Sequence, residues 1–360
     1  MEHSVYYFIN MILVVACTAM SMVFLAVPLP SNKRISKYRT SLRFLATAYL
    51  IMSSLEFMVM LFDLPIVNLL AMESLVVASL QATLFTSTLI VLINPKFITR
   101  TYIFKQLTPI ALFVATYMLV ASRWGNPVIS SLTELKLLAG HPAVMVRELL
   151  LVFYAFQLIY LTKVFVHEIR KYKAEIDNFF SDSFLLHLPG VRYSFYSALV
   201  VGVAALFSCF MYSETWVLIF TIACALFYIG FGLYYIQYPR IFQNIEQAIC
   251  PVIDFALESG NNNQLEWSQL KEEILNERYY LIYSITIEQM AQRLNIGRTT
   301  LANFINNEEG MSFNTWINSL RTESVKGLLI NYPDYSLSQI ADAIGHSDFS
   351  DFDLSYKLAT

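Results

Sequence analysis

The chain has 360 residues, of which 56% are hydrophobic and only 14% are charged, with a net charge of −3. Soluble domains contain about 25% charged residues, so this composition excludes an ordinary soluble globular protein and favours lipid-facing helices. The charge is unevenly spread, because residues 1–240 hold 17 of the 24 basic residues whereas residues 241–360 hold 7 basic and 16 acidic residues.

Seven stretches of the first region are long and apolar enough to cross a membrane, since a helical span needs about 20 apolar residues. They cover approximately residues 5–27, 42–62, 67–93, 107–121, 143–166, 193–211 and 216–238. The sequence therefore predicts an all-α protein whose residues 1–239 form a seven-helix transmembrane bundle.

Basic residues are distributed unevenly among the loops between these spans. Thirteen fall in or beside the loops after the first, third and fifth spans, whereas the alternate loops hold three, Arg123, Lys136 and Arg147. Basic loops stay on the cytoplasmic side. We therefore expect a multi-pass protein of the bacterial inner membrane, with its N-terminus outside and its C-terminus in the cytoplasm. No basic residue precedes Val5, which favours an uncleaved first helix over a signal peptide.

Ionisable side chains at membrane depth are energetically costly and are therefore candidates for function. Five of them lie towards the outer side of the predicted bundle: Glu56, Glu73, Arg123, Arg147 and Glu148. One interpretation is an outward-facing pocket for an unknown signal ligand, built from these residues. The alternative is a set of interhelical salt bridges or headgroup-level charges that hold the bundle together.

Residues 240–283 are expected to form a helical linker. Pro239-Arg240 would end the last span, and Ser259–Asn263 forms a polar break. Residues 265–283 have the apolar spacing of an amphipathic helix, which would dock on the following domain or, alternatively, mediate dimerisation. Earlier in the chain, residues 167–190 fit either an interfacial helix or a cytoplasmic extension of the fifth span.

A helix-turn-helix pattern follows the linker. Thr286 is expected to cap a first helix, because a hydroxyl cap followed three residues later by Gln289 forms a capping box. After a turn around Gly297, a second helix would run from Arg298 to about Asn306. Arg and Asn side chains on such a helix can hydrogen-bond base edges in the major groove of DNA. The residues expected to face outward are Arg298, Thr299, Ala302, Asn303 and Asn306.

The same pattern recurs fifty residues further on. Thr286–Ala291 is matched by Ser336–Ala341, which again opens with a hydroxyl residue and places a Gln three positions later. A long helix from Phe313 to about Ile330 would separate the two copies, and the second copy would turn at Gly345. Two helix-turn-helix subdomains joined by a long helix are therefore expected in residues 284–360.

Residues 284–357 resemble the AraC/XylS family of transcription regulators, and the membrane-anchored layout is similar to versions from Bacteroidetes-type bacteria. The resemblance rests on Gly310–Phe313, Leu320-Arg321, Leu328-Leu329, Ile340-Ala341, Gly345, Phe352 and Tyr356-Lys357. It implies sequence-selective binding of double-stranded DNA by both copies and control of transcription initiation. RNA polymerase and a second copy of the chain, in a homodimer, are further expected partners.

The second copy departs from the family pattern. His346 stands where the family usually has Phe, and the chain stops at Thr360, before the usual Gly-x-x-Pro ending. Acidic residues also crowd the second recognition helix, where repulsion from phosphates opposes DNA binding; they are Asp348, Asp351 and Asp353. We therefore expect the first copy to bind DNA. The second would be a degenerate structural copy or would lack its C-terminal support, in a domain shortened at its C-terminal end.

The leading hypothesis is a membrane-embedded one-component transcription regulator. The alternative is a membrane receptor whose acidic tail acts through a protein partner instead of DNA. An enzyme or transporter is a weaker hypothesis, because the sequence contains no paired-His motif, phosphate loop or nucleophile elbow. The five His and four Cys residues are scattered and indicate neither a metal site nor another cofactor.

Overall fold

The computed structural model describes residues 2–27, 36–178, 189–249, 267–283 and 285–331. Within them the regular structure is helical and contains no strands. The chain divides into two compact units. The membrane unit comprises Met1–Ile169 and Gly190–Gln243, and the C-terminal unit comprises Arg170–Pro189 and Asn244–Thr360.

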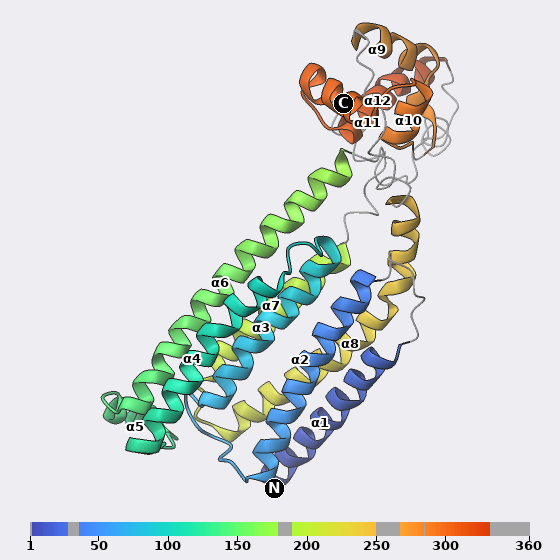
Figure 1. The fold of residues 1–360 in the computed structure, drawn as a ribbon. Helices are drawn as coiled ribbons and strands as arrows, with labels where there is room; N and C mark the ends of the chain where they lie inside the picture. The colour runs from blue at the N-terminus through green and yellow to red at the C-terminus, as the bar shows by residue number, and fades with distance from the viewer. Residues whose placement is uncertain (1, 28–35, 179–188, 250–266, 284, 332–360) are drawn as a thin grey trace. The chain divides into compact units, whose positions relative to one another are not determined.

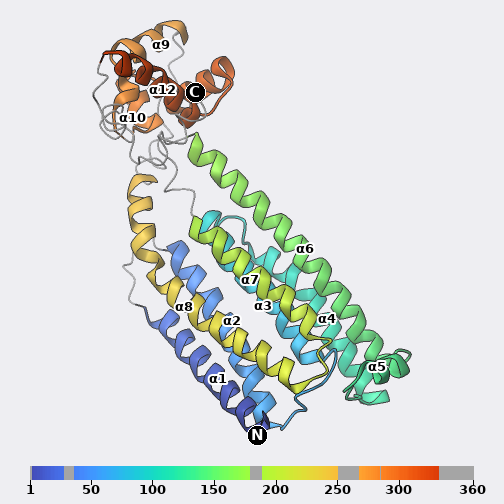
Figure 2. The same ribbon diagram turned by 180° about the vertical axis from the view of Figure 1, so that it is seen from behind.

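Seven long helices in the described residues each contain a stretch long and apolar enough to cross a membrane, which confirms the predicted seven-span bundle. They are α1 (Glu2–Ala26), α2 (Ser36–Leu61), α3 (Met72–Ile93), α4 (Arg100–Trp124), α6 (Pro142–Asp177), α7 (Pro189–Ser208) and α8 (Glu214–Ile249). A short helix that the sequence did not predict, α5 (Leu132–Leu138), lies between α4 and α6. Both α5 and the first turn of α1 lie at the same end of the bundle (Figures 1 and 2).

Helices α3 and α4 begin at positions that differ from the apolar stretches. The predicted third span starts at residue 67, but α3 begins at Met72 because Leu70 has a left-handed φ of 55°. The amide of Leu70 donates instead to the carbonyl of Cys209, over 3.0 Å. Helix α4 begins seven residues before the predicted fourth span, because the Thr99 side chain caps it by accepting from the amide of Tyr102. Hydropathy alone misses a polar first turn of this kind.

The candidate span within α8 stops at Gln237, next to Pro239-Arg240, but the helix itself continues to Ile249. Proline has no N–H, so Pro239 leaves the carbonyl of Tyr235 without its helical donor. The hydroxyl of Tyr38 in α2 donates to that carbonyl over 2.9 Å. A tertiary hydrogen bond thus compensates for the helical hydrogen bond that the proline removes, and α8 continues beyond Pro239.

Of the two interpretations of residues 167–190, an extension of the fifth span is the one that the structure supports, because α6 continues without a break to Asp177. The rest of the stretch considered for an interfacial helix, residues 179–188, lies outside the described residues. The same holds for residues 250–266 of the linker, which contain the predicted polar break.

Polar side chains join the helices of the membrane unit. Ser41 of α2 donates to the carbonyl of Thr88 in α3 over 2.9 Å. Gln81 of α3 donates to the carbonyl of Ala48 in α2 over 2.7 Å, and Gln157 of α6 donates to the hydroxyl of Thr83 over 2.9 Å. Hydrogen bonds of this kind contribute only about 0.6 kcal/mol each within a membrane, so they fix the register of the helices more than they stabilise the bundle.

The C-terminal unit contains a small helical domain. Its elements are α9 (Trp267–Asn276), a 3₁₀ turn (Tyr279–Leu281), α10 (Ile287–Arg293), α11 (Arg298–Phe304), a π-helical turn (Ile305–Glu309) and α12 (Phe313–Asn331). The apolar face of α9 docks on this domain, as the first interpretation of the linker predicts. The Trp267 ring stacks on Phe304 with a centroid distance of 5.8 Å and packs against Trp316 at 5.4 Å. The predicted second helix-turn-helix copy, within residues 336–357, lies outside the described residues.

Candidate functional site

The first helix of the candidate DNA-binding site, α10, begins with the capping box that the sequence predicts. The amide of Gln289 donates to the Thr286 hydroxyl over 3.2 Å, and the amide of Thr286 donates to the Gln289 side chain over 3.0 Å. Two amides that the helix itself cannot pair are thereby satisfied. Asn295 then turns the chain with a left-handed φ of 54°, a conformation that Asn tolerates better than most residues. These local features set the angle at which α11 leaves α10.

Helix α11 has a buried side and an exposed side. Leu301 and the following Ile305 are buried at 0% and 1% exposure and attach the helix to the domain core. The predicted contact residues lie on the other side: Arg298, Thr299, Asn303 and Asn306 are exposed, and Ala302 is half-buried. The α-helix ends at Phe304, two residues earlier than predicted, so Asn306 lies in the π-helical turn. The exposed side presents one guanidinium and two carboxamides, the groups that can pair with guanine and adenine edges.

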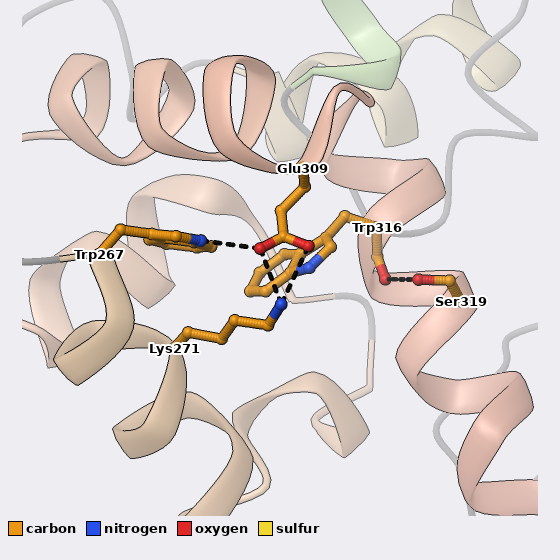
Figure 3. Close-up of polar contacts among 5 residues, drawn as sticks. All are labelled: Trp267, Lys271, Glu309, Trp316 and Ser319. Atoms are coloured by element: carbon orange, nitrogen blue, oxygen red, sulfur yellow. Dashed lines mark hydrogen bonds and ion pairs between the residues drawn. The ribbon is translucent and has the colours of Figure 1, made fainter.

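The π-helical turn is attached to α9 by a charged contact that the sequence analysis missed. Figure 3 shows the carboxylate of Glu309 facing the indole N–H of Trp267 and the ammonium group of Lys271. Trp267 Nε1 donates to Glu309 Oε1 over 2.7 Å, and Lys271 Nζ donates to the two carboxylate oxygens over 2.8 and 3.0 Å. Helix α9 thus contacts the end of the candidate recognition helix directly. These residues are about forty positions apart, so no local spacing could have indicated the contact.

The surroundings of Glu309 favour its charged form. Burial raises the pKa of this carboxyl group, but hydrogen bonds from Lys271 and Trp267 and the charge of Lys271 outweigh the effect and hold the pKa below its usual value of 4.5. Gly310 follows with a left-handed φ of 67°, which glycine adopts without strain. The chain can therefore leave the π-helical turn directly towards α12.

Arg321 is a basic residue of the domain that does not contribute to its exposed surface. It is fully buried within α12. Its Nε donates to the carbonyl of Tyr280 over 2.7 Å, and its Nη2 donates to the carbonyl of Ile282 over 3.0 Å. Arg321 therefore holds the segment between α9 and α10 against the long helix.

The membrane unit contains a partly open cavity of about 210 Å³, hereafter the membrane cavity, which is lined by residues of α1, α2, α3, α6, α7 and α8. Two of the predicted signal-site residues, Glu56 and Glu73, line it. Other polar lining residues are Asn68, Gln81 and Thr86, and aromatic side chains such as Phe85, Phe227 and Tyr228 contribute much of the remaining wall. The sequence analysis missed Gln81, although it lies eight residues after Glu73 and so on the same face of a helix.

The other three predicted signal-site residues are not among those that line the membrane cavity. Arg147 is 1% exposed and donates from Nη2 to Tyr117 over 2.9 Å and to the carbonyl of Pro127 over 3.0 Å, and it also contacts Asn126. Arg123 is exposed and lies over the ring of Trp124, and Glu148 is half-buried. Arg147 therefore joins α6 to α4 and the loop that follows it.

Metal-ligating groups are scattered in the part of the chain that the structure describes. Within that part, no three His, Cys, Asp or Glu side chains are grouped as metal ligands would be. Cys17, Cys209 and Cys224 are buried and free, which fits the behaviour of small apolar residues.

Comparison with known proteins identifies the C-terminal region. Residues 290–360 match the family model of a helix-turn-helix domain of the AraC type, over about a fifth of the chain. Neither the curated proteins nor the solved structures include a match to this chain. The region that contains α10, α11 and α12 is thus similar to the DNA-binding domains of AraC-type transcription regulators. The match also extends over the predicted second copy.

Proposed function

We propose that the chain is a one-component transcription regulator embedded in the bacterial inner membrane. It would receive a signal through its transmembrane helices and bind double-stranded DNA sequence-selectively through its cytoplasmic helix-turn-helix domain. The observation that carries the proposal is the exposed row Arg298, Thr299, Asn303 and Asn306 on the second helix of a helix-turn-helix, in a chain with seven apolar helices before it.

The proposed orientation follows from charge and from the number of spans. Thirteen basic residues accompany the loops on the side assigned to the cytoplasm, against three on the other side. An odd number of crossings then puts the C-terminal unit in the compartment that contains the chromosome. The position of α5 and of the first turn of α1 at one end of the bundle supports this alternation.

The contact between α9 and Glu309 supplies a route by which a signal would act on DNA binding. Any change in the position of α9 would move Trp267 and Lys271, and with them the turn that ends α11. Allosteric regulation needs two sites and two states. In this proposal the sites are the membrane cavity and α11, and the states differ in how α9 holds Glu309.

Two further partners belong to the proposal. Regulators with paired recognition helices commonly bind as symmetric dimers, so a homodimer is the expected DNA-binding form. Control of initiation would bring the DNA-bound protein into contact with RNA polymerase.

An acidic surface on α9 and the residue that follows it supports a second candidate function, in which the C-terminal unit binds a protein partner instead of DNA. Glu272, Glu273 and Glu277 are exposed. Phosphates repel such a surface, whereas a basic protein surface complements it.

The two candidates are separated by the salt dependence of DNA binding. The full-length protein, reconstituted in nanodiscs, is titrated with its own upstream DNA and with a scrambled duplex of equal length, from 50 to 200 mM salt as in ordinary titrations of this kind. The regulator hypothesis expects preference for the upstream DNA and affinity that falls linearly on logarithmic axes as salt rises. Equal binding to both duplexes, or none, supports the protein-partner candidate.

Arg298→Ala tests the recognition helix itself. Loss of the guanidinium should weaken binding to the preferred duplex by ~1–3 kcal/mol and relax base preference at one position. Arg278→Asn is the matched control, because Arg278 is an exposed arginine outside α11. Its φ of 51° is one that Asn tolerates. An equal loss in both variants would show a general charge effect and remove Arg298 from the recognition surface.

The cytoplasmic location has its own test. A reporter that works only in the cytoplasm should be active when fused after Thr360, and a reporter that works only outside the membrane should be inactive there. Activity on the external side would end the regulator hypothesis, whatever the motifs of the C-terminal unit.

A further inference from the structure

The membrane cavity is an acidic site without a cation of its own. Glu56 and Glu73 both line it, and its lining includes no Lys, Arg or His among the described residues. The two arginines that the sequence suggested for this pocket are occupied elsewhere, Arg147 with Tyr117 and the carbonyl of Pro127 and Arg123 over Trp124. The structure thus changes the expected pocket of mixed charge into a negative one.

Neither carboxylate has an ion-pair partner among the described residues, although carboxylates at membrane depth are stable only when something compensates their charge. Glu56 is close enough to Tyr6 and Cys17 of α1, and to Cys224 and Tyr228 of α8, to act on them electrostatically. Glu73 lies in the first turn of α3, where the helix dipole favours a negative charge. Glu56 has no such position, and in this part of the chain a proton or a bound cation would compensate its charge.

Gln81 contributes a polar side chain to the wall of the membrane cavity. It is 9% exposed and lines the cavity. Its Nε2 donates to the carbonyl of Ala48, whereas its Oε1 is buried away from the cavity and accepts no hydrogen bond from the residues that the structure describes. Gln81 therefore adds a polar group to the wall but no accessible acceptor, and the charge of the cavity comes from the two carboxylates.

Aromatic rings complete the wall of the membrane cavity. The ring of Phe85 lies 5.7 Å from that of Phe227 and 5.9 Å from that of Tyr228, and the last two are 5.6 Å apart. Aromatic faces attract cations through their quadrupoles, and aromatic cages are a known way to bind quaternary ammonium groups. Such rings suit an organic cation better than a hard metal ion, which requires six or more oxygen ligands.

We propose that the membrane cavity binds an organic cation, an amine or quaternary ammonium group on a small apolar body, with its charge near Glu56 and Glu73 and its apolar part against the aromatic wall. This inference rests on the proposed sensing function and names its ligand class. The volume of about 210 Å³ far exceeds the ~10–15 Å³ that one water molecule requires. Two carboxylates disfavour an anion, and a cation compensates their charge without requiring either of them to take up a proton, which a neutral ligand cannot do.

The first test compares probes that differ in charge but hardly in shape. Full-length protein in nanodiscs is titrated with phenyltrimethylammonium and with tert-butylbenzene, at free concentrations matched by dialysis, while thermal unfolding is followed. The ammonium probe should give saturable stabilisation and bind at least about tenfold more tightly, because a desolvated cation–aromatic contact and a charge pair are both lost in the neutral probe. Equal binding of the two probes would overturn the proposal, as would an equal effect of magnesium or sodium chloride.

The second test removes the acceptors one at a time. Glu56→Gln and Glu73→Gln should each weaken binding of phenyltrimethylammonium about tenfold. Glu214→Gln is the matched control, an exposed glutamate in the first turn of α8 that is not among the lining residues, and it should leave the affinity unchanged. Ala198→Phe places a bulky side chain in the lining at α7 without changing charge and should abolish binding. This variant keeps the test decisive if a glutamine variant folds poorly. Unchanged affinity in the glutamine variants, or an equal loss in the control, would refute the assignment.

DNA binding measured on the same preparations separates this inference from the function on which it rests. Binding of upstream DNA by a protein that ignores phenyltrimethylammonium would refute the ligand class alone. Selective binding of the cation by a protein that does not recognise DNA would support the cavity and remove the regulator.

Discussion

The two units of the molecule treat their interior charges differently. In the C-terminal unit, Arg321 donates to two backbone carbonyls and Glu309 is held between an ammonium group and an indole N–H. In the membrane unit Arg147 also donates to acceptors within the chain, but Glu56 and Glu73 line a cavity without a cationic partner among the described residues. A charge with internal partners belongs to the fold, because removing it strands those partners. A charge without them is free to pair with something that is not part of the chain.

The comparison predicts its largest effect at Arg321. Arg321→Met keeps the length of the side chain but removes the donor to the carbonyls of Tyr280 and Ile282. The carbonyl of Ile282 still accepts from the amide of Ile285, so the main cost falls on that of Tyr280. A stranded buried acceptor costs ~1–3 kcal/mol, so the C-terminal unit should lose up to about 3 kcal/mol of stability. Hydrogen exchange of amides in α10 and α12 of the full-length protein measures this loss. Arg278→Asn, at an exposed site, is the control, and a similar small change in both variants would show that Arg321 has no structural role.

Arg147 should give the next largest effect. Arg147→Met removes the donors that join α6 to Tyr117 and Pro127, and we expect a loss of about 2 kcal/mol, because hydrogen bonds within membranes contribute ~0.6–1.7 kcal/mol each. Thermal unfolding in detergent measures it, with exposed Arg123→Met as the control. The affinity for phenyltrimethylammonium should stay within about twofold of that of the unsubstituted chain, since Arg147 does not line the cavity. The comparison uses the lower Tm of the ligand-free variant as its baseline. A specific loss of that binding with unchanged stability would return Arg147 to the ligand site.

Local patterns in the sequence were sufficient for those features that depend on neighbouring residues. Apolar stretches predicted the seven spans, and a hydroxyl residue followed by Gln289 predicted the start of α10 at Thr286. The exposed face of α11 follows from helical periodicity alone, because Leu301 and Ile305 lie one turn apart and direct the other side outward. In each case the information lies within a single helix and the residue that caps it.

The features that the sequence did not predict depend on contacts between distant residues. Helix α8 continues past Pro239 because Tyr38, about two hundred residues earlier, supplies a hydrogen bond to the freed carbonyl. A count of basic residues cannot tell that Arg321 and Arg147 are buried, because their burial is set by segments far away in the sequence. The acidic character of the membrane cavity also depends on distant contacts, because the two arginines expected there make their contacts outside it.

Glu309 offers a smaller, pH-dependent effect. Its pKa is lower in the folded chain than the usual 4.5, so the stabilisation is fully present above about pH 4.5 and is lost as the pH falls through the lowered value. The Glu309 side chain is 16% exposed and that of Lys271 37%, so solvent screening limits the effect to about 1 kcal/mol. Glu309→Gln should flatten the acid limb of the unfolding curve while Glu323→Gln, at an exposed site of α12, should not. An unchanged acid limb in the Glu309 variant would contradict the assignment.

The smallest effect has the opposite sign and tests the comparison most directly. Glu56→Gln removes a charge that no described residue compensates, so the ligand-free bundle should keep its stability or gain up to about 1 kcal/mol, since a neutral amide is less costly than a carboxylate at membrane depth. Thermal unfolding of this variant and of Arg147→Met, in the same detergent and without any cation probe, measures the expected gain of stability in the first and the expected loss in the second. Glu73→Gln should behave like Glu56→Gln. If either glutamine variant lost as much stability as the arginine variant, its carboxylate would have a partner within the fold, and the distinction between the two kinds of charge would no longer hold.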